Sequence, residues 1–111
     1  MKRGYNLNRY TIQFSKDAKD DLTDIYSYIK YNLQEPNIAN KLIQKIKQEI
    51  HKLKDYPIIY PIISDDFIKT LQLRKFKIKN YFVFYRVNPN NTTIEIVRVI
   101  HSRRNWTKLL S

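Results

Sequence analysis

The chain has 111 residues and contains no cysteine, only one glycine and only two histidines. The absence of cysteine excludes disulfides, thiolate metal sites and cysteine nucleophiles, and it fits the cytoplasmic location that we expect. His51 and His101 are too few for a zinc site built from protein ligands alone, so we expect no metal and no other cofactor. Gly4 lies near the N-terminus, so no glycine-rich loop can cradle a nucleotide phosphate. No apolar run suits a signal peptide or a membrane span, so we expect no membrane partner.

Acidic residues are scarce in the C-terminal part of the chain. The whole sequence has 21 basic and 10 acidic residues, a formal net charge of +11. Residues 69–111 contain ten of the basic residues, and Glu95 is their only acid. Such a segment suits an acidic partner, which can be a nucleic acid, an anionic surface or an acidic protein. We therefore expect the C-terminal part of the chain to make the main contact with this acidic partner.

The spacing of apolar residues divides the chain into six elements. Tyr10, Ile12 and Phe14 alternate with polar residues, as in a half-buried strand. Two later segments repeat apolar residues at steps of three and four, as on one face of a helix. Of the remaining segments, residues 71–78 mix apolar and basic residues, whereas residues 81–87 and 93–101 are rich in β-branched and aromatic residues. We predict strands at residues 9–14, 71–78, 81–87 and 93–101, and helices at residues 16–33 and 36–54.

These elements predict one α+β domain over residues 1–111. Ser15 offers an N-cap oxygen to the first helix, and Pro36 suits the first position of the second. The order β-α-α-β-β-β predicts a small, mostly antiparallel sheet with a helical hairpin packed on one face. Residues 1–8 form an N-terminal extension and residues 102–111 a C-terminal tail in this prediction.

Four stretches in this order resemble the RelE/ParE toxins of type II toxin–antitoxin systems. They are FSKDAKDDLTDIYSYI, KLKDYP, LRKFKIKNYFVFYRV and IEIVRVIHSRRNW. The resemblance implies a growth-inhibiting toxin and a cognate acidic antitoxin, with operator DNA contacted only indirectly through the antitoxin. It leaves two kinds of target open, since ParE-like members poison DNA gyrase and RelE-like members cut mRNA on the ribosome.

A metal-independent, ribosome-dependent endoribonuclease would need a proton donor or acceptor and cations beside the phosphate. The candidates for catalysis are His101, Arg74 and Arg98. Two of them have a simpler interpretation as well. His101 can cap a backbone carbonyl or face water, and Arg74 can form an ion pair with a carboxylate of the helices.

Several basic and aromatic residues are candidates for binding the target or a nucleic acid. They are Lys75, Lys77, Lys79, Tyr81, Arg103, Arg104 and Trp106. Arg103 and Arg104 can contact a phosphate or an antitoxin carboxylate, or belong to a solvated tail. Trp106 can stack on a base, but Leu109 and Leu110 behind it favour a hydrophobic anchor for the tail.

One position favours gyrase over the ribosome. RelE-like nucleases tend to carry an arginine where this chain has Phe82, and phenylalanine cannot bind a phosphate oxygen. The strand end RVIHSRRNW also resembles the ParE branch. We therefore expect ParE-like action on DNA gyrase, with RelE-like mRNA cleavage as the alternative.

A non-toxic RNA-binding module remains a further alternative. Alternation in the strand at residues 81–87 places Phe82 and Phe84 on one face and Tyr81, Val83 and Tyr85 on the other. One face must be core, so the other can form an aromatic platform for bases.

Overall fold

The computed structural model describes residues 9–111, so the predicted extension at residues 1–8 lies outside the described residues. Its helices and strands follow the predicted order and end in one further short helix. They are β1 (Thr11–Phe14), α1 (Lys16–Ser27), α2 (Pro36–His51), β2 (Arg74–Ile78), β3 (Tyr81–Asn88), β4 (Thr93–His101) and α3 (Trp106–Leu110). None of the helices in the described part is long and apolar enough to cross a membrane.

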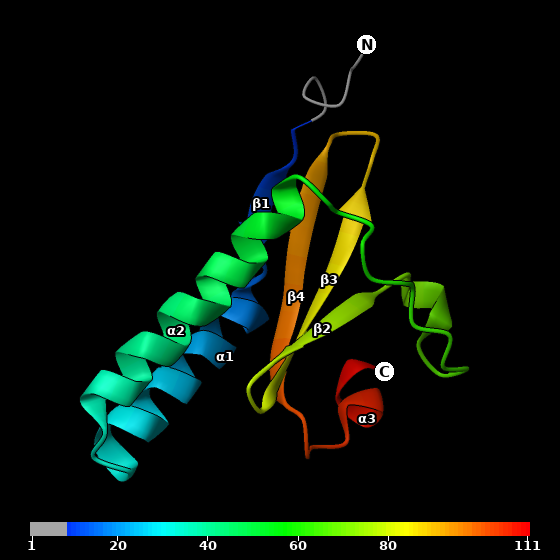
Figure 1. Cartoon of the computed structure of the whole chain (residues 1–111). Coiled ribbons are helices and arrows are strands. Elements are labelled where there is room, and N and C mark those ends of the chain that lie inside the picture. Colours follow the sequence, from blue (N-terminus) through cyan, green and yellow to red (C-terminus); the bar gives the residue numbers. More distant parts are fainter. Residues whose placement is uncertain (1–8) are drawn as a thin grey trace.

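The four strands form one sheet in the order β1-β4-β3-β2, with α1 and α2 across one face (Figure 1). The pairs β2–β3 and β3–β4 are antiparallel. This confirms the predicted α+β fold with a mostly antiparallel sheet. The sheet is mixed, because β1 pairs in parallel with β4, from Thr11 opposite Thr93 to Phe14 opposite Ile96.

Both long helices begin where the sequence predicts. The Ser15 hydroxyl accepts a hydrogen bond from the Ala18 amide at 3.0 Å, and Pro36 is the first residue of α2. Their ends are less regular than predicted. After α1 the chain continues through a π-helical turn, Tyr28–Asn32, and after α2 through a 3₁₀ turn, Lys52–Lys54. Each prediction thus merged an α-helix with the turn that follows it.

One local prediction was wrong. The strand predicted from residue 71 begins at Arg74, because Lys69–Leu71 form a 3₁₀ turn and Gln72 adopts a left-handed conformation with φ 55°. A left-handed residue reverses the chain direction locally and cannot belong to a strand. The tail ends in a short helix that the sequence analysis did not assign, α3, where the Asn105 side chain accepts a hydrogen bond from the Lys108 amide at 3.3 Å.

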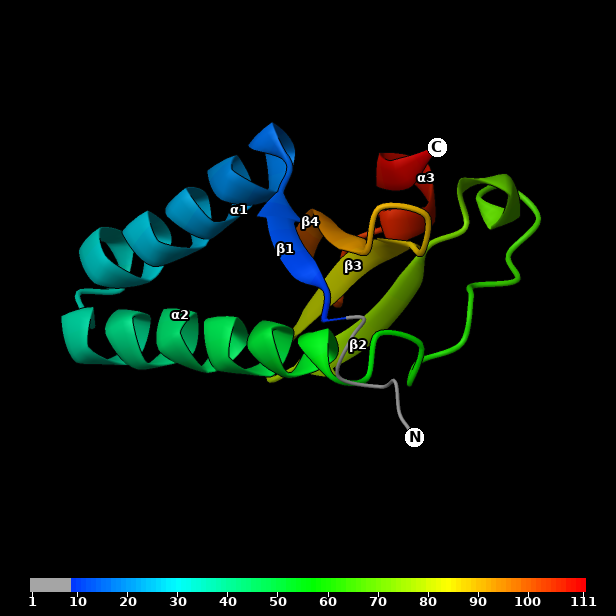
Figure 2. The ribbon, with the colours of Figure 1, turned by 90° about the horizontal axis from the view of Figure 1, so that it is seen from above.

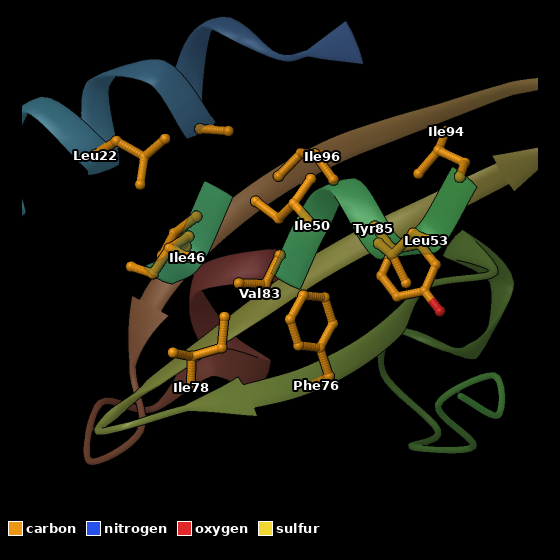
Figure 3. Close-up of a cluster of buried hydrophobic side chains, with 12 residues drawn as sticks. Leu22, Ile46, Ile50, Leu53, Phe76, Ile78, Val83, Tyr85, Ile94 and Ile96 are labelled. Atoms are coloured by element: carbon orange, nitrogen blue, oxygen red, sulfur yellow. The ribbon is translucent and has the colours of Figure 1, made fainter. Parts of the chain in front are cut away.

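The core lies between the sheet and α2. Figure 3 shows Ile46 and Ile50 of α2, and Leu53 of the 3₁₀ turn after it, above Val83 and Tyr85 of β3. Tyr85 is fully buried, and its hydroxyl donates a hydrogen bond to the Pro57 carbonyl oxygen at 3.1 Å. Burial raises the pKa of Tyr85 to about 12. Tyr85 thereby ties the long connection after α2 to the sheet.

This buried phenol gives a test at alkaline pH. The folded state favours neutral Tyr85, because its pKa is raised from 10.0 to about 12. Its contribution to stability is therefore complete below pH 10 and disappears as the pH rises towards 12, a loss of about 2 kcal/mol. Tyr85→Phe cannot ionise, so we expect its unfolding free energy to fall less than that of the wild type over this range. At neutral pH the variant loses one hydrogen bond, about 1 kcal/mol.

The measurement is urea unfolding followed by circular dichroism between neutral pH and pH 12. Tyr56→Phe is the matched control, because Tyr56 lies on the same connection and is 65% exposed. An equal alkaline loss in wild type and Tyr85→Phe would contradict the prediction.

Candidate functional site

Arg98, one of the three candidates for catalysis, is held by a structural ion pair. Its Nε and Nη2 donate to the two carboxylate oxygens of Asp21 at 2.7 and 2.9 Å. Both side chains are mostly buried, and the bond to Asp21 raises the pKa of the Arg98 guanidinium. The same carboxylate accepts a hydrogen bond from the Val99 amide at 2.8 Å. Asp21 of α1 therefore serves as a cap on β4.

This cap is needed because β4 is longer than β1. The parallel pairing ends at Phe14 opposite Ile96, which leaves the backbone of the last residues of β4 without a strand on that side. The Ser15 hydroxyl donates to the Val97 carbonyl oxygen at 2.8 Å, and Asp21 takes the next amide, that of Val99. One of these hydrogen-bonding groups belongs to the N-cap residue of α1 and the other to its first half. The N-terminal part of α1 therefore takes the place of a neighbouring strand.

Arg74, the second candidate for catalysis, lies at the opposite end of β2 from the turn next to His101, opposite the middle of β3. Arg74 is paired with Tyr85, whereas His101 is paired with Tyr81. Those tyrosines are four residues apart on β3, which corresponds to about 13 Å along the strand. Arg74 Nη1 donates to the Tyr60 carbonyl oxygen. Within residues 9–111 it forms no ion pair with a helix carboxylate, so that prediction was wrong.

His101 ends β4 beside an aromatic neighbour. Its ring packs edge-on against Tyr81, with centroids 5.2 Å apart, and its Nδ1 accepts a hydrogen bond from the Arg103 amide at 3.1 Å. In the neutral ring this contact places the proton on Nε2. The structure therefore does not bring His101, Arg74 and Arg98 together. No group of three potential metal-binding side chains occurs among residues 9–111 either.

His101 and Tyr81 lie at one end of a groove of about 940 Å³ between the helical hairpin and the turn after β2. Burial, and then the neighbouring Tyr28, raises the pKa of Tyr81. The groove has an apolar floor and a rim with more basic than acidic residues. Its lining consists of Tyr28, Ile29, Leu33, Glu35, Ile38, Lys41, Leu42, Gln44, Lys45, Gln48, Lys79, Asn80, Tyr81 and His101. We call this the hairpin groove.

The hairpin groove was not predicted from the sequence as a binding surface. Leu33 fits the apolar face predicted for the first helix, yet Tyr28, Leu33 and Ile38 are each more than half exposed. A signal was available in the sequence. These residues lie near the break between the two helices. A four-stranded sheet is too narrow to cover that end of the helical hairpin, and the sequence predicts no other element that could cover it.

The opposite face of the sheet is covered by α3. The Trp106 ring lies 5.5 Å from Phe84 and 6.2 Å from Phe82, and Lys75 Nζ lies 4.8 Å from the centre of the Phe82 ring. Phe84 is fully buried, so it cannot stack on a base. Trp106 thus anchors the tail, and Lys75 is engaged with the aromatic cluster, whereas Lys77 on the same strand is exposed.

Arg103 and Arg104 remain exposed at the end of the sheet. The tight turn that carries them follows β4, and the Ser102 amide donates to the Asn80 carbonyl oxygen at 2.7 Å. This bond ties the turn to the one between β2 and β3, which carries the exposed Lys79. The structure therefore gathers Lys79, Arg103 and Arg104 at one end of the sheet, next to His101. We call these three cations the basic end.

Residues 12–106 match the family model of the ParE toxin of the type II toxin–antitoxin system parDE. The chain belongs to the ParE toxin family. It is accordingly a type II toxin, as the resemblance predicted.

Solved structures agree with this fold. The chain is similar to a chain of the chromosomal ParDE toxin–antitoxin system from P. aeruginosa, with 19% identity and a TM-score of 0.69, covering 85% of this chain and 97% of that one. It is also similar to a chain of the RelBE2 toxin–antitoxin complex from Mycobacterium tuberculosis, with 21% identity and a TM-score of 0.58, covering 84% and 98%. No curated protein matches the sequence.

Proposed function

We propose that this ParE-family toxin arrests bacterial growth by binding its target rather than by cutting RNA, and that the target is DNA gyrase. The observation that carries this proposal is the separation of the residues expected to cut. Arg98 is paired with Asp21, and Arg74 lies opposite Tyr85, four residues along β3 from the Tyr81 that pairs with His101, or about 13 Å away. A metal-free nuclease needs its cations within reach of one phosphate. Membership of the ParE family supports the same target.

The basic end is the proposed contact with the target. Lys79, Arg103 and Arg104 are exposed, and the sequence around them is strongly basic. Charges of one sign at one end of a small domain steer it towards an acidic surface and fix its orientation there. The contact would therefore be made with an acidic patch of the target protein.

The hairpin groove is the proposed binding site of an antitoxin. The similar structures from P. aeruginosa and M. tuberculosis come from toxin–antitoxin systems. In this chain Leu33 and Ile38 are exposed apolar residues of the groove lining, and Lys41 and Lys45 stand on its rim. An amphipathic segment with acidic side chains suits such a surface, since its apolar side chains enter the groove and its carboxylates face the lysines. Operator DNA would be contacted by the antitoxin alone.

RelE-like cleavage of mRNA on the ribosome is the second candidate, and one observation favours it. His101 lies beside Tyr81, and the basic end lies next to both. Imidazole and phenol groups can transfer protons, and lysine and arginine can hold a phosphate.

Controlled expression in a bacterium separates the two candidates. Gyrase-type action predicts growth arrest with gyrase-linked DNA breaks and intact mRNA. Cleaved mRNA in translating cells, without DNA breaks, would overturn the proposal in favour of the nuclease. An absence of growth arrest would contradict both gyrase poisoning and mRNA cleavage.

His101→Ala is expected to retain most of the toxicity. If His101 is one contact at the margin of a binding surface, its loss costs about 1 kcal/mol. A general acid or base would instead be worth roughly 10²–10⁴-fold in rate. His51→Ala is the control, since His51 is exposed on α2. The measurement is the inducer dose that halves growth; a loss of killing confined to His101→Ala, with the fold retained, would contradict binding as the mechanism.

A further inference from the structure

The connection between α2 and β2 differs in charge from the rest of the toxin. Residues 55–68 contain three acidic residues and no basic residue, whereas the other 97 residues contain 21 basic and 7 acidic ones. Large apolar side chains of this connection are exposed as well. They are Tyr56, Ile58, Ile59, Ile62 and Phe67. Clustered exposure of this kind marks a contact surface.

Phe67 is the most prominent of these side chains, with 78% of its surface exposed. Its position is fixed by the turn around it. The Asp65 carboxylate accepts a hydrogen bond from the Phe67 amide at 2.8 Å, and the next residue, Ile68, is fully buried. Because the turn is already ordered, little conformational freedom is lost when Phe67 enters a partner. Asp66 stands beside it, 3.4 Å from Lys69 in an exposed and therefore weak pair.

The hairpin groove has the complementary chemistry. Its floor is apolar, its rim carries Lys41, Lys45 and Lys79, and its volume of about 940 Å³ accommodates an aromatic side chain with its neighbours. Figure 2 shows the tip of the helical hairpin and the acidic connection at opposite ends of the molecule, whose longest extent is 50 Å. A toxin molecule therefore cannot fill its own groove, but a second copy can.

We propose that two free copies of this toxin pair through two equivalent contacts. In each contact, Phe67 of one copy enters the hairpin groove of the other, and Asp65 and Asp66 face Lys41 and Lys45. Two elongated copies side by side in opposite directions bring both ends together at once. The contact is then reciprocal, and the assembly closes as a dimer instead of growing into a chain.

The pairing has a consequence for regulation. An occupied groove cannot receive another apolar, acidic segment, so pairing and antitoxin binding would exclude each other. This consequence depends on the antitoxin-binding site proposed above. The pairing of two toxin copies does not depend on it.

Sedimentation velocity of the purified full-length toxin tests the pairing. Over about 1–100 µM, where interfaces of modest size associate, the wild type is expected to shift from monomer to dimer. Phe67→Ser is expected to raise the dissociation constant at least about tenfold, as loss of a central aromatic anchor does. Phe67 is exposed, so the variant should keep its fold. Tyr31→Ser is the matched control, because Tyr31 is 65% exposed but does not line the groove.

A charge exchange identifies the two surfaces. Asp65→Lys/Asp66→Lys and Lys41→Glu should each weaken self-pairing, because each puts like charges in both contacts. Mixed together, the two variants should pair again, since one contact joins the two altered surfaces and the other joins two native ones. A wild type that stays monomeric, a Phe67→Ser variant that pairs normally, or a mixture that does not recover would each overturn the proposal. None of these readouts depends on gyrase or on growth arrest.

Discussion

Reversing both charges of the tail, in Arg103→Glu/Arg104→Glu, is expected to abolish growth arrest. Both side chains are exposed at the basic end, so the substitution places two carboxylates where the proposed acidic target surface docks. Like charges brought together across an interface cost several kcal/mol, which weakens binding by roughly a hundredfold or more. The measurements are the inducer dose that halves growth and the affinity of the purified variant for gyrase.

A matched control separates the local effect from the change in net charge. Lys16→Glu/Lys19→Glu lowers the net charge by the same amount at two exposed positions of α1, which do not belong to the basic end. This control should remain toxic. Equal loss of toxicity in both variants would show that net charge, and not the docking of the tail, carries the effect. Full toxicity of Arg103→Glu/Arg104→Glu would contradict the proposed target surface.

The elements of this fold were predictable because their signals are local. Ser15 caps α1 with its own hydroxyl, and Pro36 starts α2 with its fixed backbone angle. β4 occupies residues Thr93–His101, as its β-branched composition predicted. Each of these signals acts within a few residues of the position that it determines, so a single sequence is enough to read it.

The arrangement of the elements depends on contacts between distant residues, and the sequence predicted less of it. The parallel pairing of β1 with β4 joins residues about eighty positions apart, from Thr11 opposite Thr93. The register of β3 against β4 shifts between Phe84 and Tyr85, which a strict alternation of faces does not anticipate. Neither feature follows from the periodicity of a strand.

The candidate site shows the same division. Arg103 and Arg104 were predicted either to contact a partner or to belong to a solvated tail, and both are exposed, as residues beyond the end of a strand usually are. Arg98 was grouped with His101 and Arg74 because its residue type can hold a phosphate, but its partner Asp21 lies 77 residues away. The residues next to a basic residue on a strand do not indicate whether a carboxylate of another helix or strand will pair with it.

The pair formed by Asp21 and Arg98 leads to the largest expected effect on stability. Asp21→Ala leaves a mostly buried guanidinium without its counter-charge and the Val99 amide without its acceptor. Breaking a buried pair by removing one partner typically costs 3–5 kcal/mol, and partial exposure of these side chains reduces that figure to about 3 kcal/mol. We expect a loss of this size in the free energy of unfolding, measured by urea titration with circular dichroism.

Two neighbouring substitutions sharpen the test. Asp20→Ala removes an exposed pair with Lys16 on the same helix and should cost no more than about 0.5 kcal/mol. Asp21→Asn keeps an oxygen for the Val99 amide but loses the charge that faces Arg98, so its loss should fall between the other two. If Asp21→Ala and Asp20→Ala were equally mild, the cap on β4 would not stabilise the fold. Arg98 would then be free of its structural role, and its place in a catalytic site would have to be considered again.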